Sequence, residues 1–299
     1  LLEEGDHDAS TIDKSMKLLT YNVMEGGVKP DPSRLEKVLQ VIDEQNADIV
    51  GLQETLLTKG KENELITALR EKGIYLQDIV FDREQDWAHT TGVALFSKYA
   101  ASSTRIVGEK VKAVEMTFPV NFNNGDAPAH PALNSNFSLS NVYLSHVDEK
   151  TRLPQVKEVL QELHREKGNY HLLMGDFNAL SPEDNIPASA VDSFSERMKE
   201  KYCRDGKLCY DTIEAVLQAG YVDVGRHFYN PEEITGKTDL SGGTGGHTRP
   251  IRMDFIFAKP ELLPYVQEFT IVKEGLARTA SDHFPWYVIL DETRFQLPT

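Results

Sequence analysis

Apolar residues along the chain fall into strand-like runs and helix-like spacings that follow one another from end to end. Helical spacing predicts three helices, at 35–42, 153–163 and 212–219. The first of these follows Asp31 and Pro32, which suit a cap and a first turn. Apolar runs between the first two helices predict strands near residues 74–81, 91–98, 104–108, 113–122 and 137–147. Because several strands follow one another without a helix between them, the pattern predicts mixed β-sheets packed face to face, with helices outside.

Two long stretches without such periodicity interrupt the pattern. Residues 121–136 are rich in Asn, Pro and Ala, and residues 225–250 are rich in glycine. Long connections in compact domains are usually either functional or disordered. The second stretch leads into the strand that carries Asp254, so we expect it to border a substrate cleft and to help select the leaving group. A plain surface loop is the alternative.

One apolar run, 171–174, leads directly into Gly175, Asp176, Phe177 and Asn178. A continuous run of this kind is typical of a strand that is buried on both faces. Alternate residues of a strand share a face, so the pattern predicts that Asp176 and Asn178 point the same way. Gly175 has no side chain, which suits a position where the strand meets a ligand or a neighbouring backbone.

Other apolar runs carry polar side chains at or just past their ends in the same way. A single Asp or His at such a position is usually a cap or a hydrogen-bonded core residue, so none of them identifies a site alone. Their recurrence at the ends of several strands indicates that the strands build one. The candidate site residues are Asn22, Glu54, His146, Asp176, Asn178, Asp254, Asp282 and His283.

Three of these candidates are acids whose charges would need compensation. If Glu54, Asp176 and Asp282 converge, two carboxylates ~4 Å apart repel by roughly 4 kcal/mol at an effective dielectric constant near 20. Oxygen ligands without a Cys/His cage favour Mg²⁺ or Mn²⁺ over zinc. The alternative is that each acid pairs with an arginine, in which case chelators would have little effect. The arginines considered for such pairs are Arg152, Arg249 and Arg252.

Composition limits the class of protein. Lys and Arg number 32 and Asp and Glu 47, which gives a net charge of −15 and excludes a globally basic surface for nucleic acid, although a local basic stripe stays open. No stretch approaches ~18 consecutive apolar residues.

We expect a flexible acidic tail at 1–15 and one catalytic domain at 16–299. The chain begins with Leu, so we expect processing or truncation, and the location stays open between export and cytoplasm. Cys203 and Cys209 either form a disulfide or stay reduced.

Taken in chain order, the candidate residues and their neighbours resemble the endonuclease/exonuclease/phosphatase superfamily, which has the deoxyribonuclease-I-like fold. The motifs that carry the resemblance run through nearly the whole chain: Thr20 to Asn22, Gly51 to Glu54, Gly92 to Lys98, His146 with Arg152 and Gln155, Gly175 to Asn178, Arg252 to Ile256, and Ser281 to His283. The resemblance implies an α+β fold, namely a four-layer α/β/β/α sandwich in which two packed mixed β-sheets are flanked by helices.

The resemblance also implies a metal-dependent hydrolase of phosphoesters, with Mg²⁺ as cofactor and Mn²⁺ as a substitute. Glu54 would be the principal metal ligand, with Asn22 and Asp282 close to the ion. Asp176 would orient and deprotonate the attacking water, aided by Asn178.

The remaining roles fall to the imidazoles. His283, held by Asp254, would stabilise charge on the phosphoryl oxygens, and His146 would contact the same phosphate. In some nucleases of the superfamily a glutamate partners the first histidine, and the stretch from Asp82 to Thr91 offers no clear counterpart.

The superfamily includes nucleases, neutral sphingomyelinases, inositol polyphosphate 5-phosphatases and tyrosyl-DNA phosphodiesterases, so the resemblance does not select a substrate. We expect a monomeric phosphodiesterase or nuclease, because the sequence has neither a membrane-insertion segment nor a basic headgroup patch. Nucleic acid, a phospholipid and a small phosphodiester all stay open as its phosphoester substrate. One alternative is a lipid- or inositol-directed enzyme, and another is a non-catalytic module that binds phosphate or a protein. A degenerate module should lose site residues, whereas this chain keeps all eight.

Overall fold

The computed structural model describes residues 15–27, 31–58, 64–81, 89–108, 111–122, 136–165, 170–230, 251–292 and 295–296. Its first β-sheet has six strands in the order β14-β15-β1-β2-β4-β3. In that order the strands are Val266–Ile271, Trp286–Asp291, Ser15–Asn22, Ile49–Thr58, His89–Ser97 and Tyr75–Phe81. Strands β1 and β2 run parallel, and the other neighbouring pairs are antiparallel.

The second β-sheet also has six strands, in the order β12-β13-β9-β8-β6-β5. In that order the strands are Val222–Asp223, Asp254–Ala258, Tyr170–Asp176, Asn136–Tyr143, Lys112–Pro119 and Ser103–Ile106. Strands β8 and β9 run parallel and the other pairs antiparallel, so both sheets are mixed, as predicted. Two short pairs lie outside the sheets: β10 (Cys203–Arg204) with β11 (Lys207–Leu208), and β7 (Asn121–Phe122) with β16 (Phe295–Gln296).

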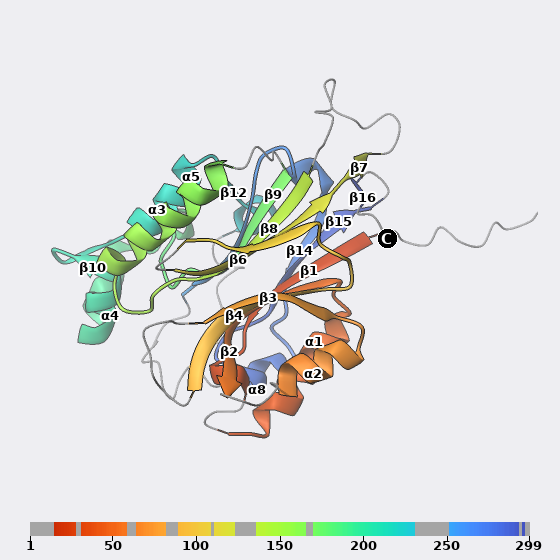
Figure 1. Cartoon of the computed structure of the whole chain (residues 1–299). Helices are drawn as coiled ribbons and strands as arrows, with labels where there is room; N and C mark the ends of the chain where they lie inside the picture. Colours follow the sequence, from red (N-terminus) through yellow and green to blue (C-terminus); the bar gives the residue numbers. More distant parts are fainter. Residues whose placement is uncertain are drawn as a thin grey trace, which may run out of the picture.

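Helices cover the outer faces of the two sheets (Figure 1). On the first sheet lie α1 (Arg34–Gln45), α2 (Glu64–Glu71) and α8 (Ala277–Ala280), and on the second α3 (Glu149–Arg165) and α5 (Asp211–Gln218). Helix α4 (Glu196–Tyr202) follows strand β9, and α6 (Val224–Phe228) follows β12. The remaining helical segments are the 3-10 turns Glu25–Gly27, Pro182–Asp184, Ala188–Ser193 and Leu263–Tyr265. The four-layer α/β/β/α sandwich predicted from the sequence is confirmed. No helix in the described part of the chain combines the length and apolar character that crossing a bilayer requires.

Strand β9 shows how the layers form. Leu172 and Met174 belong to the apolar cluster between the sheets, whereas Leu173 belongs to the cluster under α3 and α5. Every residue of β9 is buried. The continuous apolar run therefore arises because alternate residues serve different layers.

The two sheets are in close contact where β2 faces β8 and β9. A Cβ on Gly51 would lie 2.5 Å from Met174 Cε and 2.9 Å from Asn141 Cγ, so only glycine fits there. The Asn141 amide donates to the Leu52 carbonyl at 3.1 Å and accepts from Gln53 Nε2 at 2.5 Å. These contacts fix the carboxyl end of β2 against the second sheet, directly before Glu54.

The structure corrects several element boundaries. The first helix begins at Arg34 with Ser33 as its N-cap residue, and Asp31 instead accepts hydrogen bonds from Ser33. Strand β8 ends at Tyr143, so the predicted strand 137–147 was too long, because the chain turns where Ser145 N donates to Gln155 Oε1 at 2.8 Å.

Other sequence expectations fall partly or wholly outside the described residues. The predicted loop 225–250 was wrong over its first residues, which belong to α6, and residues 231–250 are not described. The predicted tail at 1–15 lies outside the described residues except for Ser15, which begins β1. The first predicted loop, 121–136, also lies outside them except at its two ends, which belong to β7 and β8. Cys203 and Cys209 are both free thiols in this structure.

Candidate active site

The register of the two sheets brings the candidate residues to one end of the sandwich. Asn22 closes β1, and β15, which is antiparallel to β1, begins just after Asp282 and His283. In the second sheet Asp176 closes β9 and stands opposite Asp254, the first residue of antiparallel β13. The carboxyl ends of β1 and β9 thus lie beside the amino ends of β15 and β13, their antiparallel neighbours, at the same edge of the sandwich.

Glu54 reaches the site through a break in β2. The pairing of β2 with β4 shifts register between Gln53 and Thr55, and Glu54 has a φ of 55°. Such a bulge re-aims a side chain out of its strand. The Glu54 carboxylate accepts hydrogen bonds from Asn22 Nδ2 at 3.2 Å and Tyr143 Oη at 2.9 Å. It also accepts from the Glu25 backbone N–H at 3.0 Å.

Asp176 is held by amide groups. Its carboxylate accepts from the Asn178 backbone N–H at 2.8 Å, from Asn178 Nδ2 at 3.2 Å and from Asn22 Nδ2 at 3.0 Å. Asn22 therefore links Glu54 to Asp176 across the two sheets. Strand β9 ends at Asp176 and the chain turns at Asn178, whose φ is 50°, so the two side chains meet through this turn and not through the strand alternation that the sequence predicted. Gly175 meets a neighbouring backbone, since a Cβ there would lie 2.1 Å from the Val142 carbonyl oxygen.

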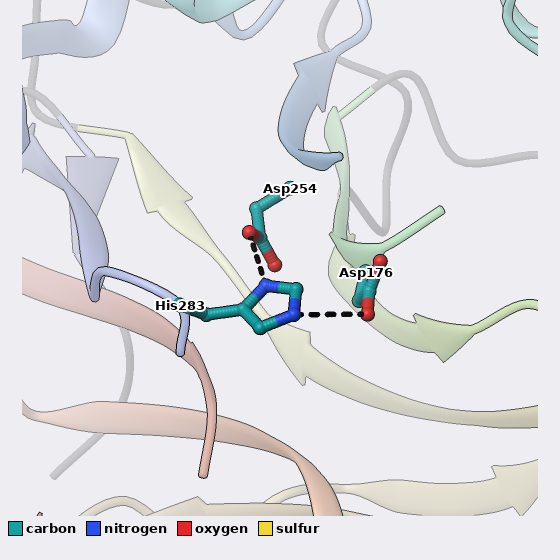
Figure 2. A group of neighbouring side chains, drawn as sticks. All are labelled: Asp176, Asp254 and His283. Carbon is teal, nitrogen blue, oxygen red and sulfur yellow. Dashed lines mark hydrogen bonds and ion pairs between the residues drawn. The ribbon is translucent and has the colours of Figure 1, made fainter. Parts of the chain in front are cut away.

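His283 connects Asp254 with Asp176 (Figure 2). Its Nδ1 lies 2.7 Å from Asp254 Oδ2, and its Nε2 lies 3.8 Å from Asp176 Oδ2. Burial alone would lower the pKa of His283, but the charges of Asp254 and Asp176 outweigh it and raise that pKa well above the usual value. Burial raises the pKa of Asp176 to about 7, against the opposing effect of the His283 charge. The three residues thus form a buried chain of acid, imidazole and acid.

Asp282 lies at the first-sheet side of the site. Burial raises its pKa and the neighbouring charge of Glu54 raises it further, whereas the charge of His283 and, to a smaller extent, that of Arg34 oppose the rise. Arg34, which the sequence analysis missed, donates to the Ala280 carbonyl at 2.8 Å and to the Val23 carbonyl at 3.1 Å. Ser281 Oγ adds a hydrogen bond of 2.7 Å to the Asn22 carbonyl. These contacts fix Asp282 beside the end of β1.

His146 stands apart from this network. It lies on the loop after β8, is exposed, and makes no hydrogen bond with the described residues. Partial burial lowers its pKa, and the positive charge of Lys201 lowers it further. A glutamate partner of His146 would lie between Asp82 and Thr91. Residues 82–88 of this stretch are outside the described part of the chain.

The donor atoms of the site fit a hard divalent cation. Glu54, Asp282 and Asp176 supply carboxylate oxygens, and burial together with a neighbouring carboxylate raises the pKa of the two aspartates against the opposing charge of His283. A second arrangement is the trio Asp176, Asp254 and His283, whose ligand atoms lie within 4.8 Å of one another. There the His283 Nδ1 is already engaged by Asp254, so an oxygen site around Glu54 suits Mg²⁺ or Mn²⁺ better. Asn22 turns its amide N–H groups toward Glu54 and Asp176, so its place beside an ion stays a prediction.

Arg152 and Arg252 do not neutralise these acids. Arg252 lies 2.6 Å from Asp184 and 2.6 Å from Asp223. Arg152 pairs with Glu149 at 3.0 Å. Arg249 is outside the described residues. The alternative in which arginines pair with the site carboxylates therefore does not hold for Arg152 and Arg252.

Sequence reasoning also missed Tyr143 and Lys201. Tyr143 closes β8 and donates to Glu54, so its position at a strand end was an available signal. Lys201 lies on α4, where no motif marks it.

Solved structures share this fold at low sequence identity. An AP endonuclease from Archaeoglobus fulgidus is 20% identical, with 92% of this chain and 99% of that chain covered and a TM-score of 0.64. The 3′ phosphatase NExo from Neisseria, bound to product DNA hairpin, is 19% identical, with 92% and 99% covered and a TM-score of 0.61. An endonuclease/exonuclease/phosphatase family protein from Leptotrichia buccalis is 18% identical, with 91% and 98% covered and a TM-score of 0.60. Among curated protein sequences, none matches this chain.

The match that identifies the family comes from sequence. The model of the Endonuclease/Exonuclease/phosphatase family matches residues 19–283, which include all eight candidate residues. Membership of that family supports phosphoester hydrolysis as the activity. The chain belongs to the endonuclease/exonuclease/phosphatase family.

Proposed function

We propose that the chain is a divalent-metal-dependent phosphodiesterase of the nuclease type, in which Asp176 activates the attacking water. The observation that carries the proposal is the buried chain of Asp254, His283 and Asp176 next to the Glu54 carboxylate. We further propose that residues 16–299 form one catalytic domain and that the protein acts as a monomer.

Asp176 suits the role of a general base. Its pKa of about 7 places it near the operating pH, where a base is most effective. The hydrogen bonds from Asn178 and Asn22 fix the direction of its carboxylate, so a water on its open side would be aligned for in-line attack.

His283 suits the stabilisation of charge on the phosphate. The pairing with Asp254 raises its pKa and holds its ring, so a protonated Nε2 is available to a phosphoryl oxygen that gains charge as phosphorus becomes five-coordinate. His146, on its exposed loop, would contact the same phosphate from another side.

Glu54, Asp282 and Asn22 would hold the cation, with Mg²⁺ as the preferred ion and Mn²⁺ as its substitute. When bound, such an ion polarises the phosphoryl oxygen and lowers the charge repulsion among the acids. We propose nucleic acid as the substrate class, and the DNA-directed names of the AP endonuclease and of the DNA-bound 3′ phosphatase support this choice.

A substrate panel tests the proposal. The protein would be assayed with Mg²⁺, and after EDTA, on single- and double-stranded DNA, RNA, sphingomyelin, inositol phosphates and a 5′-tyrosyl oligonucleotide. We expect metal-dependent cleavage of nucleic acid that falls by ~10²-fold or more in Asp176→Asn. Asp205→Asn is the matched control, because Asp205 is exposed in the turn between β10 and β11. Undiminished cleavage by a folded Asp176→Asn protein, or hydrolysis of a lipid substrate alone, would contradict the proposal.

A further inference from the structure

The end of helix α4 is anchored to both catalytic strands of the second sheet. Its last residue, Tyr202, is buried and donates from its hydroxyl to Met253 Sδ at 3.0 Å. The Met253 carbonyl in turn accepts from the Phe177 backbone N–H at 2.9 Å. Met253 directly precedes Asp254 and Phe177 directly follows Asp176. The last turn of α4 is therefore fixed relative to these two acids.

A buried arginine holds the same turn against the loop of His146. The Arg152 guanidinium is fully buried and donates to the Lys201 carbonyl at 2.5 Å and to the Ser145 carbonyl at 3.3 Å. Its charge is balanced by Glu149, whose carboxylate accepts from Arg152 Nε at 3.1 Å. The two carbonyls belong to Lys201 itself and to the residue before His146. Arg152 thus places Lys201 and His146 on the same side of the site.

The Lys201 ammonium has no anionic or hydrogen-bonding partner among the described residues. The residue is only 9% exposed, and the nearest favourable contact of its Nζ is the Tyr202 ring, whose centroid lies 5.4 Å away. Asp176 and Glu54 lie close enough to raise its pKa, but burial dominates and lowers that pKa to about 8. A buried cation without a hydrogen-bonded partner is costly, and such positions are found mainly where a ligand completes the site.

Positive charge continues along the outer side of α4. Arg197 precedes Lys201 by four residues, which places the two side chains on the same face of the helix, and Arg197 is exposed. The charges of Lys201 and Arg197 both lower the pKa of His146. In a chain of net charge −15, Lys201 and Arg197 form a local positive pair beside His146 and the site carboxylates.

We propose that Lys201 binds a nonbridging oxygen of the substrate phosphate and is a further catalytic residue of this site. The inference rests on the proposed function, since it assigns a contact to the phosphate that the carboxylates and His283 act on. Lys201 and His146 hold the phosphate from the α4 side, while His283 reaches it from the side of Asp254. An ammonium–phosphate contact is a charge-assisted hydrogen bond, so its loss should weaken phosphate binding by about tenfold or more.

The test measures binding of inorganic phosphate by isothermal titration calorimetry in the presence of Mg²⁺, together with phosphodiester hydrolysis. Lys201→Met removes the charge and keeps a flexible side chain, and Lys201→Arg keeps the charge. Lys199→Met is the matched control, because Lys199 lies on the same helix and pairs with Glu196 at 2.8 Å. We expect Lys201→Met to lose about tenfold or more in phosphate affinity, Lys201→Arg to lose less, and Lys199→Met to match the wild type.

Chemical protection in the unaltered protein gives a second readout that does not depend on the folding of a variant. Inorganic phosphate should slow reductive methylation of Lys201, measured by peptide mass spectrometry, and leave Lys199 unaffected. Equal phosphate affinity of the wild type and Lys201→Met, or equal labelling of Lys201 with and without phosphate, would overturn the inference alone. Absence of phosphoester hydrolysis by the wild type would instead overturn the proposed function.

Discussion

Replacing Asp176 with Asn should stabilise the metal-free protein at neutral and alkaline pH. Asp176 is 1% exposed, and burial raises its pKa from 3.8 to about 7. Below the unfolded pKa both states are protonated and ionisation adds no penalty. As pH rises from about 4 to about 7, the unfolded chain ionises while the folded chain resists, so stability is lost over this window. The side-chain amide of the Asp176→Asn variant is neutral at every pH, so the variant does not lose this stability.

The magnitude follows from the shift. About three pH units at roughly 1.4 kcal/mol each give a penalty of about 4 kcal/mol above pH 7, of which about 1 kcal/mol has already developed at pH ~4.5. In Asp176→Asn the new amide would also face the N–H donors of Asn22 and Asn178, and this conflict costs about 1–3 kcal/mol at every pH. The difference in unfolding free energy between variant and wild type should therefore move by about 3 kcal/mol in favour of the variant between pH ~4.5 and pH ~8.

Urea unfolding in EDTA, followed by circular dichroism at both pH values, measures this difference. Asp205→Asn, at an exposed carboxylate, serves as the control. Added Mg²⁺ should reduce the advantage of the variant at pH ~8, because a cation compensates the ionised carboxylate. A difference between variant and wild type that is the same at both pH values would refute the claim that burial raises the pKa of Asp176.

Two further predictions concern the metal site and the strand that carries the base. Mg²⁺ at ~100 times its dissociation constant should stabilise the wild type by about 2.7 kcal/mol, and Glu54→Gln should remove most of this gain in a thermal melt. If Glu54→Gln responds to Mg²⁺ as the wild type does, Glu54 is not the principal ligand. Gly175→Ala should destabilise the fold by about 3 kcal/mol or more, because its Cβ would lie 2.1 Å from the Val142 carbonyl oxygen at a φ of 136°. An unchanged urea midpoint for Gly175→Ala would show that β8 and β9 can move apart.

The ends of the buried strands were readable from the sequence for a physical reason. A strand buried on both faces carries mostly apolar side chains, so a carboxylate or amide at the end of the run marks the point where the strand leaves the core. Asp176 after 171–174 follows this rule, and so does Asn22 at the end of β1. Residues on irregular backbone do not follow this rule. Glu54 points into the site because of a bulge in β2, and His146 lies on a loop where the apolar pattern predicted a continuing strand.

Lys201 and Arg34 could not be predicted from the sequence as site residues, for a different reason. Each occupies a helix whose local pattern is that of an ordinary amphipathic element, and each reaches the site only through partners far away in the chain. Arg34 bonds to the carbonyl of Ala280, 246 residues later, and Lys201 is placed by Arg152, 49 residues earlier. Pairings of this kind carry no local signal, because either partner alone reads as a solvated charge.

The distribution of buried arginines explains why a cation should matter to this protein. Arg252 compensates Asp184 and Asp223, and Arg152 compensates Glu149, so both arginines are occupied with holding loops and helices together. At the site, Asp254 and Asp176 share the charge of one imidazole, His283. The other donors to Glu54 and Asp176 are neutral N–H and hydroxyl groups, which orient the carboxylates but do not remove their charge. One imidazole cannot balance the four acids Glu54, Asp176, Asp254 and Asp282, so the folded state keeps an electrostatic cost that a bound cation, or protonation, would relieve. For the proposed metal and phosphate site we therefore expect the free energy of unfolding to rise with added Mg²⁺ and to fall as pH rises in EDTA.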